Sequence, residues 1–356
     1  MRSFLNPMAR SFMRNFVLAA ALSLIPFQAS SWSTTPAVAQ EATLTDPASG
    51  DSASNKTRVF KFTYAAVLTN LQPGKSVKVW LPVATGNHDQ DVEFLDINQE
   101  NFERTSEKKY GNALIYFQAT ANDAGEVPVE VNYLVTRREL TSKSLEPAGD
   151  QAKSFLGSST LVPTSDELRK IVMDSAGHSE SSDAASAIQV ARQLYDGVDN
   201  HMKYNKPADI KGWGKGDAVW ACDSKFGNCT DFHSLFIASA RNLKIPSKFE
   251  IGFPIPVGSN SGTVGGYHCW AKFLADGKWL PVDISEADKH PELKEYYFGN
   301  LSADRVMFSV GRDLELVPAN DAGPVNYLVY PYAEVDGKQH RAFTKAFRFE
   351  DVETGK

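Results

Sequence analysis

Cysteine is scarce in this chain, with three among 356 residues, which are too few and too uneven for a scaffold built on disulfides. Beyond the first 39 residues, no apolar run reaches the roughly 20 residues that a membrane-spanning helix needs. Runs of basic residues are lacking too, and 43 acidic residues against 37 basic ones give a net charge of −6. Electrostatic binding to nucleic acid or anionic lipid is therefore not expected.

The composition that remains is that of a globular chain. Hydrophobic residues make up 42% and charged residues 22%, which is too apolar for wholesale disorder. At roughly 100–200 residues per domain, the length predicts two domains or three small ones.

The first 39 residues have the parts of a secretory signal peptide. Three arginines without a nearby acidic residue precede the apolar run 16–27, which is too short to cross a bilayer. Ala37 and Ala39 put small residues where a signal peptidase reads, so we expect cleavage between Ala39 and Gln40. Cleavage removes three arginines and no acidic residue, which brings the net charge to −9. We expect an exported protein, periplasmic or extracellular, with no stable membrane insertion after cleavage and in a compartment that permits disulfides.

The mature chain divides by its pattern. Residues 40–57 are rich in Ser, Ala, Asp and Thr and are expected to form a flexible tether. Residues 58–145 alternate with a period of two and predict a small β-sandwich domain. Residues 155–300 mix helical and strand patterns, and residues 301–356 are expected to be a β-rich C-terminal extension. The alternating runs of the sandwich are 60–68, 77–83, 113–117 and 127–135.

The segment 227–236 is predicted to open a helix. It reads GNCTDFHSLF, in which Asn228 and Asp231 suit a helix cap and first turn. Cys229 would then sit at the helix N-terminus, where free N–H groups and the helix dipole favour a thiolate, the form that acts as a nucleophile. A buried structural cysteine is the alternative, and position alone leaves both open.

A hairpin downstream supplies an imidazole and a carboxylate. The pair Asp276 and Gly277 between two alternating strands is a strong signal for a two-residue turn. With Ala275 opposite Lys278, His268 and Asp283 fall on one face as diagonal neighbours, roughly 7–8 Å apart at the backbone. A register slip of one residue would separate them, leaving Ser285 or Glu286 as the substitute partner.

Cys229, His268 and Asp283 thus form a candidate catalytic triad. Cys229 would attack an acyl carbon, His268 would move the proton, and Asp283 would hold the imidazole tautomer. The backbone N–H of Cys229 is a candidate oxyanion donor, and the indole N–H of Trp213 or Trp220 is a possible second.

Other uses of the same residues are weaker. A metal site is disfavoured because the gap from Cys222 to Cys229 is wider than usual zinc spacing and because His268 and Cys269 point to opposite faces of a strand. No metal or other cofactor is therefore expected. His233 lies about one helical turn after Cys229 and fits packing inside the helix layer. Cys222 and Cys269 could pair as a disulfide or remain two buried thiols.

The motifs resemble the transglutaminase-like superfamily, especially its secreted bacterial branch. The resemblance rests on GNCTDFHSLF, YHCWA and WLPVD in that order, and covers roughly residues 160–300. It implies an α+β class with a papain-like transglutaminase core, in which a helix carrying the cysteine packs on an antiparallel sheet. It also implies thiol-based acyl chemistry at Cys229, His268 and Asp283. The segment 304–314 resembles one often seen after this core, without a role that the sequence assigns.

The expected activity is acyl transfer or hydrolysis at amide or peptide bonds, with a protein or peptide substrate. Water as acceptor would make the protein a peptidase or amidase, and an amine would make it a cross-linker. The alternative is a non-catalytic, transglutaminase-like binding module. Neither the substrate nor the oligomeric state follows from the sequence.

Overall fold

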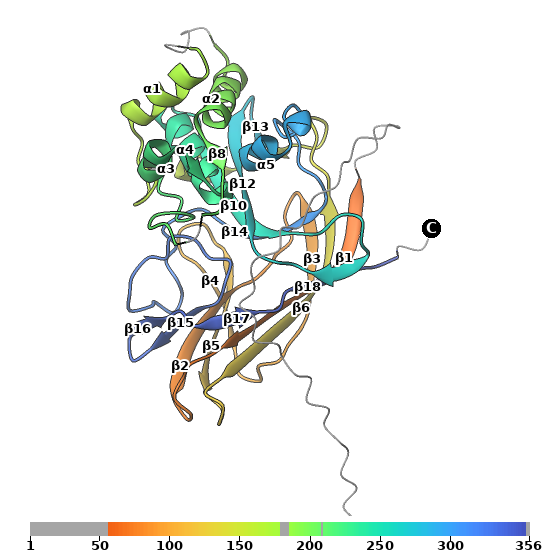
Figure 1. Ribbon diagram of the computed structural model, residues 1–356. Coiled ribbons are helices and arrows are strands. Elements are labelled where there is room, and N and C mark those ends of the chain that lie inside the picture. Colours follow the sequence, from red (N-terminus) through yellow and green to blue (C-terminus); the bar gives the residue numbers. More distant parts are fainter. Residues whose placement is uncertain (1–55, 179–184, 208, 354–356) are drawn as a thin grey trace, which may run out of the picture. The chain divides into compact units, whose positions relative to one another are not determined.

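The computed structural model describes residues 56–178, 185–207 and 209–353 (Figure 1). The expected signal peptide, and the expected tether as far as residue 55, lie outside these residues. The described chain combines helices with antiparallel sheets, which confirms the predicted α+β class. Within these ranges, no helix has the length and apolar character needed to cross a membrane.

A six-stranded and a five-stranded sheet form the lower and right-hand part of the molecule in Figure 1. The alternation predicted for the first strand is confirmed, since residues 60, 62, 64, 66 and 68 are all buried. The N-terminal strands of these sheets are β1 (Thr57–Leu68), β2 (Ser76–Pro82), β3 (Gln90–Ile97), β4 (Glu103–Ser106), β5 (Ala113–Thr120) and β6 (Val127–Arg138). Sequence analysis did not identify strands β3 and β4, because polar side chains make up half of β3 and all of β4 and most positions of the two strands are exposed.

The end of the chain returns to these same sheets. β17 and β18 both pair with β1, and β15 pairs with β2. The sheet orders are β11-β18-β1-β6-β3, with β17 also on β1, and β16-β15-β2-β5-β4. The added strands are β11 (Ser261–Thr263), β15 (Tyr332–Val335), β16 (Lys338–His340), β17 (Phe343–Lys345) and β18 (Arg348–Asp351). Both sheets therefore take strands from opposite ends of the sequence.

A third sheet carries the helices, with strand order β14-β10-β12-β13-β7. The predicted hairpin register is confirmed, because Ala275 pairs with Lys278 and Ala271 with Val282. Asp276 and Gly277 have φ angles of 48° and 72°, as a two-residue turn of this kind requires. The strands are β7 (Glu146–Pro147), β10 (Ser247–Pro254), β12 (His268–Ala275), β13 (Lys278–Val282) and β14 (Arg305–Val310).

Helix α4 lies between this sheet and the other helices, and it contacts β10 and β12 on one side and α1, α2 and α3 on the other (Figure 1). Helix α1 begins after an N-cap serine, Ser165, whose side chain accepts a hydrogen bond from Leu168 N. The helices are α1 (Asp166–Ser175), α2 (Ala187–His201), α3 (Ala218–Ser224), α4 (Cys229–Asn242) and α5 (Ile284–Lys289). Two 3₁₀ turns (Asp150–Phe155 and Pro291–Leu293) and a short parallel pair, β8 (Lys203–Tyr204) with β9 (Phe226–Gly227), complete the elements.

Aromatic side chains join the third sheet to the first. The ring of Phe253 on β10 lies 5.2 Å from that of Phe62 on β1 and 4.5 Å from that of Phe347. Phe308 on β14 packs edge-on against Phe253 at 5.2 Å. Such pairs contribute about 0.5–1.5 kcal/mol each beyond their buried area. This packing fixes the sheet that carries β12 and β14 against β1.

Candidate active site

Cys229 is the first residue of α4, as its local sequence predicts. The side chain of Asn228 accepts a hydrogen bond from Thr230 N at 2.9 Å, and the Asp231 carboxylate accepts one from Asn228 N at 3.0 Å. This reciprocal capping box makes Cys229 the first residue of the helix. The buried thiol therefore lies at the positive end of the α4 dipole.

Asp231 also anchors the glycine-rich loop before α3. Its two carboxylate oxygens accept from the N–H groups of Gly214 and Gly216, each at 2.9 Å. Burial raises the pKa of Asp231 to about 6, although these backbone hydrogen bonds act to lower it. The loop is thereby held against the start of α4.

His268, the first residue of β12, reaches Asp283 in the way the hairpin register predicts. Its Nε2 lies 2.7 Å from Oδ2 of Asp283. Asp283 follows the end of β13 and is the N-cap of α5, where its Oδ1 accepts from Glu286 N at 3.3 Å and from the Ser285 hydroxyl at 3.2 Å. The carboxylate is wholly buried. Because Nε2 faces Asp283, Nδ1 is the ring nitrogen left for Cys229.

The electrostatics of Cys229 and His268 favour an ion pair. Burial would raise the pKa of the Cys229 thiol, but hydrogen bonds with Cys269 and His268 and the charge of His268 outweigh it and lower that pKa well below its ordinary value. Burial would lower the pKa of His268, whereas the charge and hydrogen bond of Asp283, and then the bond to Cys229, raise it to about 10. Near neutral pH, this arrangement stabilises a thiolate beside an imidazolium.

Asp283 stays ionised despite its burial. Burial would raise its pKa, but the charge and hydrogen bond of His268, followed by the charge of Arg305, lower that pKa below its ordinary range. Arg305, the first residue of β14, places Nη1 3.1 Å from Asp283 Oδ2.

His233 ties the two halves of the site together. Its Nε2 accepts a hydrogen bond from Ile284 N at 3.0 Å, so its Nδ1–H donates to the carbonyl oxygen of Cys229 at 2.7 Å. This pattern requires the neutral ring, and burial also lowers the pKa of His233. His233 thus links the helix that carries Cys229 to the helix that Asp283 begins, from the buried interior of α4.

Tyr267 makes a second link between the two halves. Its hydroxyl lies 3.0 Å from Asn228 Nδ2 and 3.0 Å from Thr230 Oγ1, the neighbours of Cys229 on either side. Because Tyr267 directly precedes His268, these bonds hold the start of β12 against the start of α4.

All three cysteines are free. Cys269 Sγ lies 3.8 Å from Thr230 Oγ1, and burial together with the hydrogen bond to Cys229 raises the pKa of Cys269 well above its ordinary value. A neutral thiol therefore stands beside the Cys229 sulfur as a hydrogen-bond donor. Cys222 lies instead against His201, with Sγ 3.7 Å from Nε2, so the structure holds no disulfide between Cys222 and Cys269.

The two candidate tryptophans lie in the loop and helix before α4. Trp213 Nε1 donates to the carbonyl oxygen of Asn205 at 2.7 Å, so its indole N–H is already bonded. Trp220 packs edge-on against Phe226, and a side chain at Gly212 would meet its ring within 2.5 Å. Both indoles make packing contacts in this conformation.

One set of described residues has the spacing of a metal site. His268, Asp283 and Glu286 offer ligand atoms that lie within 4.8 Å of one another. Each carboxylate already has a cation, because Arg305 pairs with Asp283 and Lys289 with Glu286. A metal ion would have to displace both pairs, so the donor set suits a proton relay better than a divalent ion.

The structure thus brings together His268 and Asp283, as predicted, beside the start of α4, but the contacts that Arg305, His233 and Tyr267 make here were not predicted. Arg305 lies in the segment 304–314, which stood out in the sequence without a role. His233 had a detectable signal, since it is four residues after Cys229 in a helix and must lie on the same side. Nothing local marks the long-range contact of Tyr267 with Asn228.

Sequence comparisons relate part of this chain to a known family and most of it to one further protein. Residues 177–284 match the model of the transglutaminase-like superfamily, a range that contains Cys229, His268 and Asp283. An uncharacterized protein of Haemophilus influenzae is 26% identical over 340 residues, covering 82% of this chain and 90% of its own length.

Two solved structures are similar at lower levels. A candidate cysteine protease from Cytophaga hutchinsonii is 15% identical, with a TM-score of 0.49 over 83% of this chain and 98% of its own. The periplasmic domain of TgpA from Pseudomonas aeruginosa, bound to ethylmercury, is 15% identical, with a TM-score of 0.34 over 68% of this chain and 94% of its own. Residues 177–284 of this chain are thus similar in sequence to the core domain of the transglutaminase-like superfamily.

Proposed function

We propose that this protein is an exported, thiol-dependent enzyme that transfers or hydrolyses acyl groups at amide or peptide bonds, with Cys229, His268 and Asp283 as its catalytic residues. The observation that carries the proposal is the chain of contacts from the Cys229 thiol to His268 and on to Asp283 Oδ2, 2.7 Å from His268 Nε2. Export rests on the signal-like residues 1–39, with cleavage proposed between Ala39 and Gln40.

The chemistry follows from the ion pair. The Cys229 thiolate attacks the carbonyl carbon, and the backbone N–H of Cys229, at a helix position without an intrahelical acceptor, stabilises the oxyanion. His268 then gives its Nδ1 proton to the leaving amine, and the C–N bond breaks to leave a thioester. His268 next takes a proton from water or from an incoming amine, which attacks the thioester and releases Cys229 as a thiolate. Asp283 holds Nε2 throughout. Trp213 could add an oxyanion donor only by giving up its bond to Asn205.

Mass spectrometry of the purified protein with a glutamine-containing peptide and a primary amine tests the reaction. Loss of ammonia with hydrolysis would identify water as the acceptor, and incorporation of the amine would identify an amine acceptor. Backbone cleavage would identify the peptide bond as the bond that is broken. Iodoacetamide labelling near neutral pH supplies a test that needs no substrate, since Cys229 should react faster than Cys222 and lose that advantage in His268→Ala. An ordinary reactivity of Cys229, together with no product from any peptide, would instead favour the non-catalytic binding module.

A further inference from the structure

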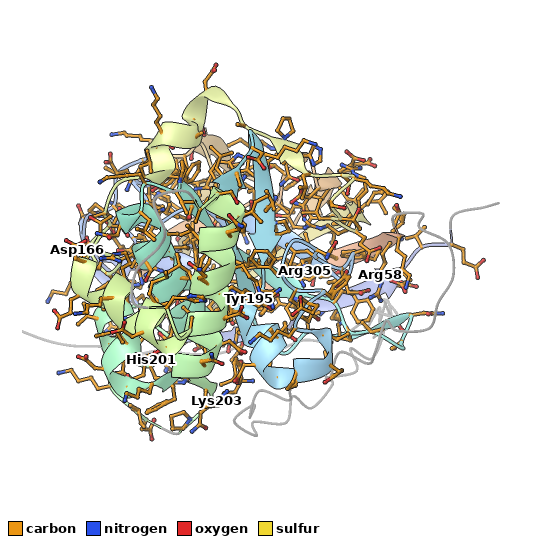
Figure 2. The ribbon with its side chains drawn as sticks, turned by 90° about the horizontal axis from the view of Figure 1, so that it is seen from above. Arg58, Asp166, Tyr195, His201, Lys203 and Arg305 are labelled. Carbon is orange, nitrogen blue, oxygen red and sulfur yellow. The ribbon has the colours of Figure 1, made fainter. Side chains whose placement is uncertain are left out.

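The segment after the core places an arginine behind the candidate triad. Arg305 is buried, and in Figure 2, which looks down on the helices, it lies toward the middle of the view while Asp166 lies at its edge. Its Nη1 lies 3.1 Å from Oδ2 of Asp283, the same oxygen that His268 Nε2 contacts at 2.7 Å. One carboxylate oxygen therefore serves the imidazole and the guanidinium together.

Asp283 needs a partner whose positive charge is permanent. Its other oxygen accepts from two neutral donors, the Ser285 hydroxyl and the Glu286 N–H. In the proposed reaction, His268 alternates between imidazolium and neutral imidazole. During the neutral phase, a buried carboxylate with no other charge partner would be strongly destabilised.

The surrounding groups do not supply that charge. His233 Nε2 is 3.8 Å from Asp283 Oδ1, but this ring is neutral because Nε2 accepts from Ile284 N. Lys289 on α5 is paired with Glu286. Cys229 and Cys269 carry a negative or no charge, and Tyr195 on α2 and Tyr297, which also face Asp283, are neutral phenols with raised pKa values, chiefly because of burial. Within the described residues, Arg305 is the permanent cation that pairs directly with Asp283.

We propose that Arg305 is a positioning residue of this site, whose guanidinium keeps the Asp283 carboxylate ionised and aimed at His268 while the imidazole gains and loses its proton. The inference rests on the proposed function. It gives a role to the segment 304–314, which lies outside the residues that match the family model.

A second buried arginine provides a matched control. Arg137 on β6 and Arg305 both approach the ring of Trp270, with guanidinium carbons 5.8 and 4.8 Å from its centre. Arg137 instead contacts Gln90 Oε1 at 3.3 Å and Asp89 Oδ2 at 3.5 Å. Replacing either arginine removes a buried guanidinium from the same aromatic ring, but only Arg305 contacts Asp283.

The test measures the rate of Cys229 alkylation by iodoacetamide as a function of pH, read by mass spectrometry of the peptide that contains Cys229. The mature-length protein is compared with Arg305→Met, Arg305→Lys and Arg137→Met. Removing a positive charge from the buried cluster makes every proton there harder to lose, so the midpoint for thiolate formation should rise by about one pH unit in Arg305→Met. Arg305→Lys keeps the charge and should lie between Arg305→Met and wild type, and Arg137→Met should keep the wild-type midpoint.

Turnover adds a second readout. Because Arg305 is buried and contacts Asp283, Arg305→Met should lower kcat by about 10- to 100-fold and leave KM unchanged. Thermal unfolding of each variant checks the fold, and Arg305→Lys remains the deciding variant if Arg305→Met does not fold. A wild-type midpoint in the folded Arg305 variants, or an equal rise in Arg137→Met, overturns the role of Arg305 alone. If Cys229 of the wild-type protein reacts like an ordinary thiol at every pH, both the role of Arg305 and the proposed function are overturned.

Discussion

Replacing Asp283 by asparagine probes the candidate site sharply because donors face both oxygens of the carboxylate. Oδ2 faces His268 Nε2 at 2.7 Å and Arg305 Nη1 at 3.1 Å. Oδ1 faces the Ser285 hydroxyl at 3.2 Å and the Glu286 N–H at 3.3 Å. An amide has one acceptor oxygen, so its NH₂ group must point at one of these two pairs of donors.

Both orientations of the asparagine damage the reaction. With NH₂ toward His268, the ring must present a bare Nε2 and carry its proton on Nδ1, so it cannot accept the thiol proton. With NH₂ toward Glu286, the helix loses its cap, at a cost of about 1 kcal/mol. The pKa of His268, about 10 in the native protein, then falls toward its ordinary value because the anion that raised it is gone. If Asp283 supplies about 3 kcal/mol of ion-pair stability, its loss lowers the thiolate–imidazolium population about 10²-fold. We therefore expect Asp283→Asn to lower kcat by about 10²- to 10⁴-fold.

The assay is steady-state turnover of whichever peptide the wild-type protein converts, with chemical unfolding alongside. Asp217→Asn is the matched control, since Asp217 caps α3 by accepting from Val219 N and Trp220 N and has no contact with the triad among its hydrogen bonds. Asparagine caps helices about as well as aspartate, so this control should keep its activity. Turnover of Asp283→Asn within a few fold of wild type would refute the role assigned to Asp283.

Three other perturbations have defined outcomes. Cys229→Ala should abolish turnover and change the pH dependence of stability. From about pH 6.5 to 8.5 the native pair carries one proton, on His268, and the unfolded chain also carries one, on the Cys229 thiol. Because the proton number does not change on unfolding, the pair adds no pH dependence to the free energy of unfolding in this range. In Cys229→Ala only the raised pKa of His268 remains, and stability should fall as pH rises through this window; parallel curves from chemical unfolding would argue against the ion pair. Cys269→Ala should raise the pKa of the Cys229 thiol by removing a donor, whereas Cys269→Ser keeps one; ultraviolet titration of the thiolate measures both, and equal midpoints would show that Cys269 does not stabilise it. Gly216→Ala should destabilise the protein by about 1–3 kcal/mol more than Gly74→Ala, since both glycines have positive φ but only a side chain at Gly216 would meet atoms at 2.6 Å, on Ser234 and Thr230; similar unfolding midpoints would show that the loop yields freely.

The parts of the site that sequence predicted are those set by local rules. Asn228 and Asp231 form a capping box within four residues, which fixes where α4 begins and hence where Cys229 lies. Asp276 and Gly277 fix a two-residue turn, and the turn fixes the register that brings His268 toward Asp283.

The missed parts depend on contacts between distant segments. Arg305 reaches Asp283 from β14, which is separated from β13 in the third sheet by β10 and β12. Asp283 itself lies just beyond the paired part of β13, at the cap of α5, so hairpin pairing alone does not describe its final position. The pairing of β17 and β18 with β1 is likewise absent from any local pattern, because a strand's sequence states which face it buries but not which neighbour it joins.

That pairing has a consequence for biosynthesis. β1 is among the first described strands to leave the ribosome, and the partners that cover its outer edge are the last ones made. Until residues 343–351 have emerged, the nascent chain carries an open strand edge, at which incomplete chains are prone to aggregate. A stop codon before residue 343 should therefore leave β1, the first described strand, without the two partners on its outer edge.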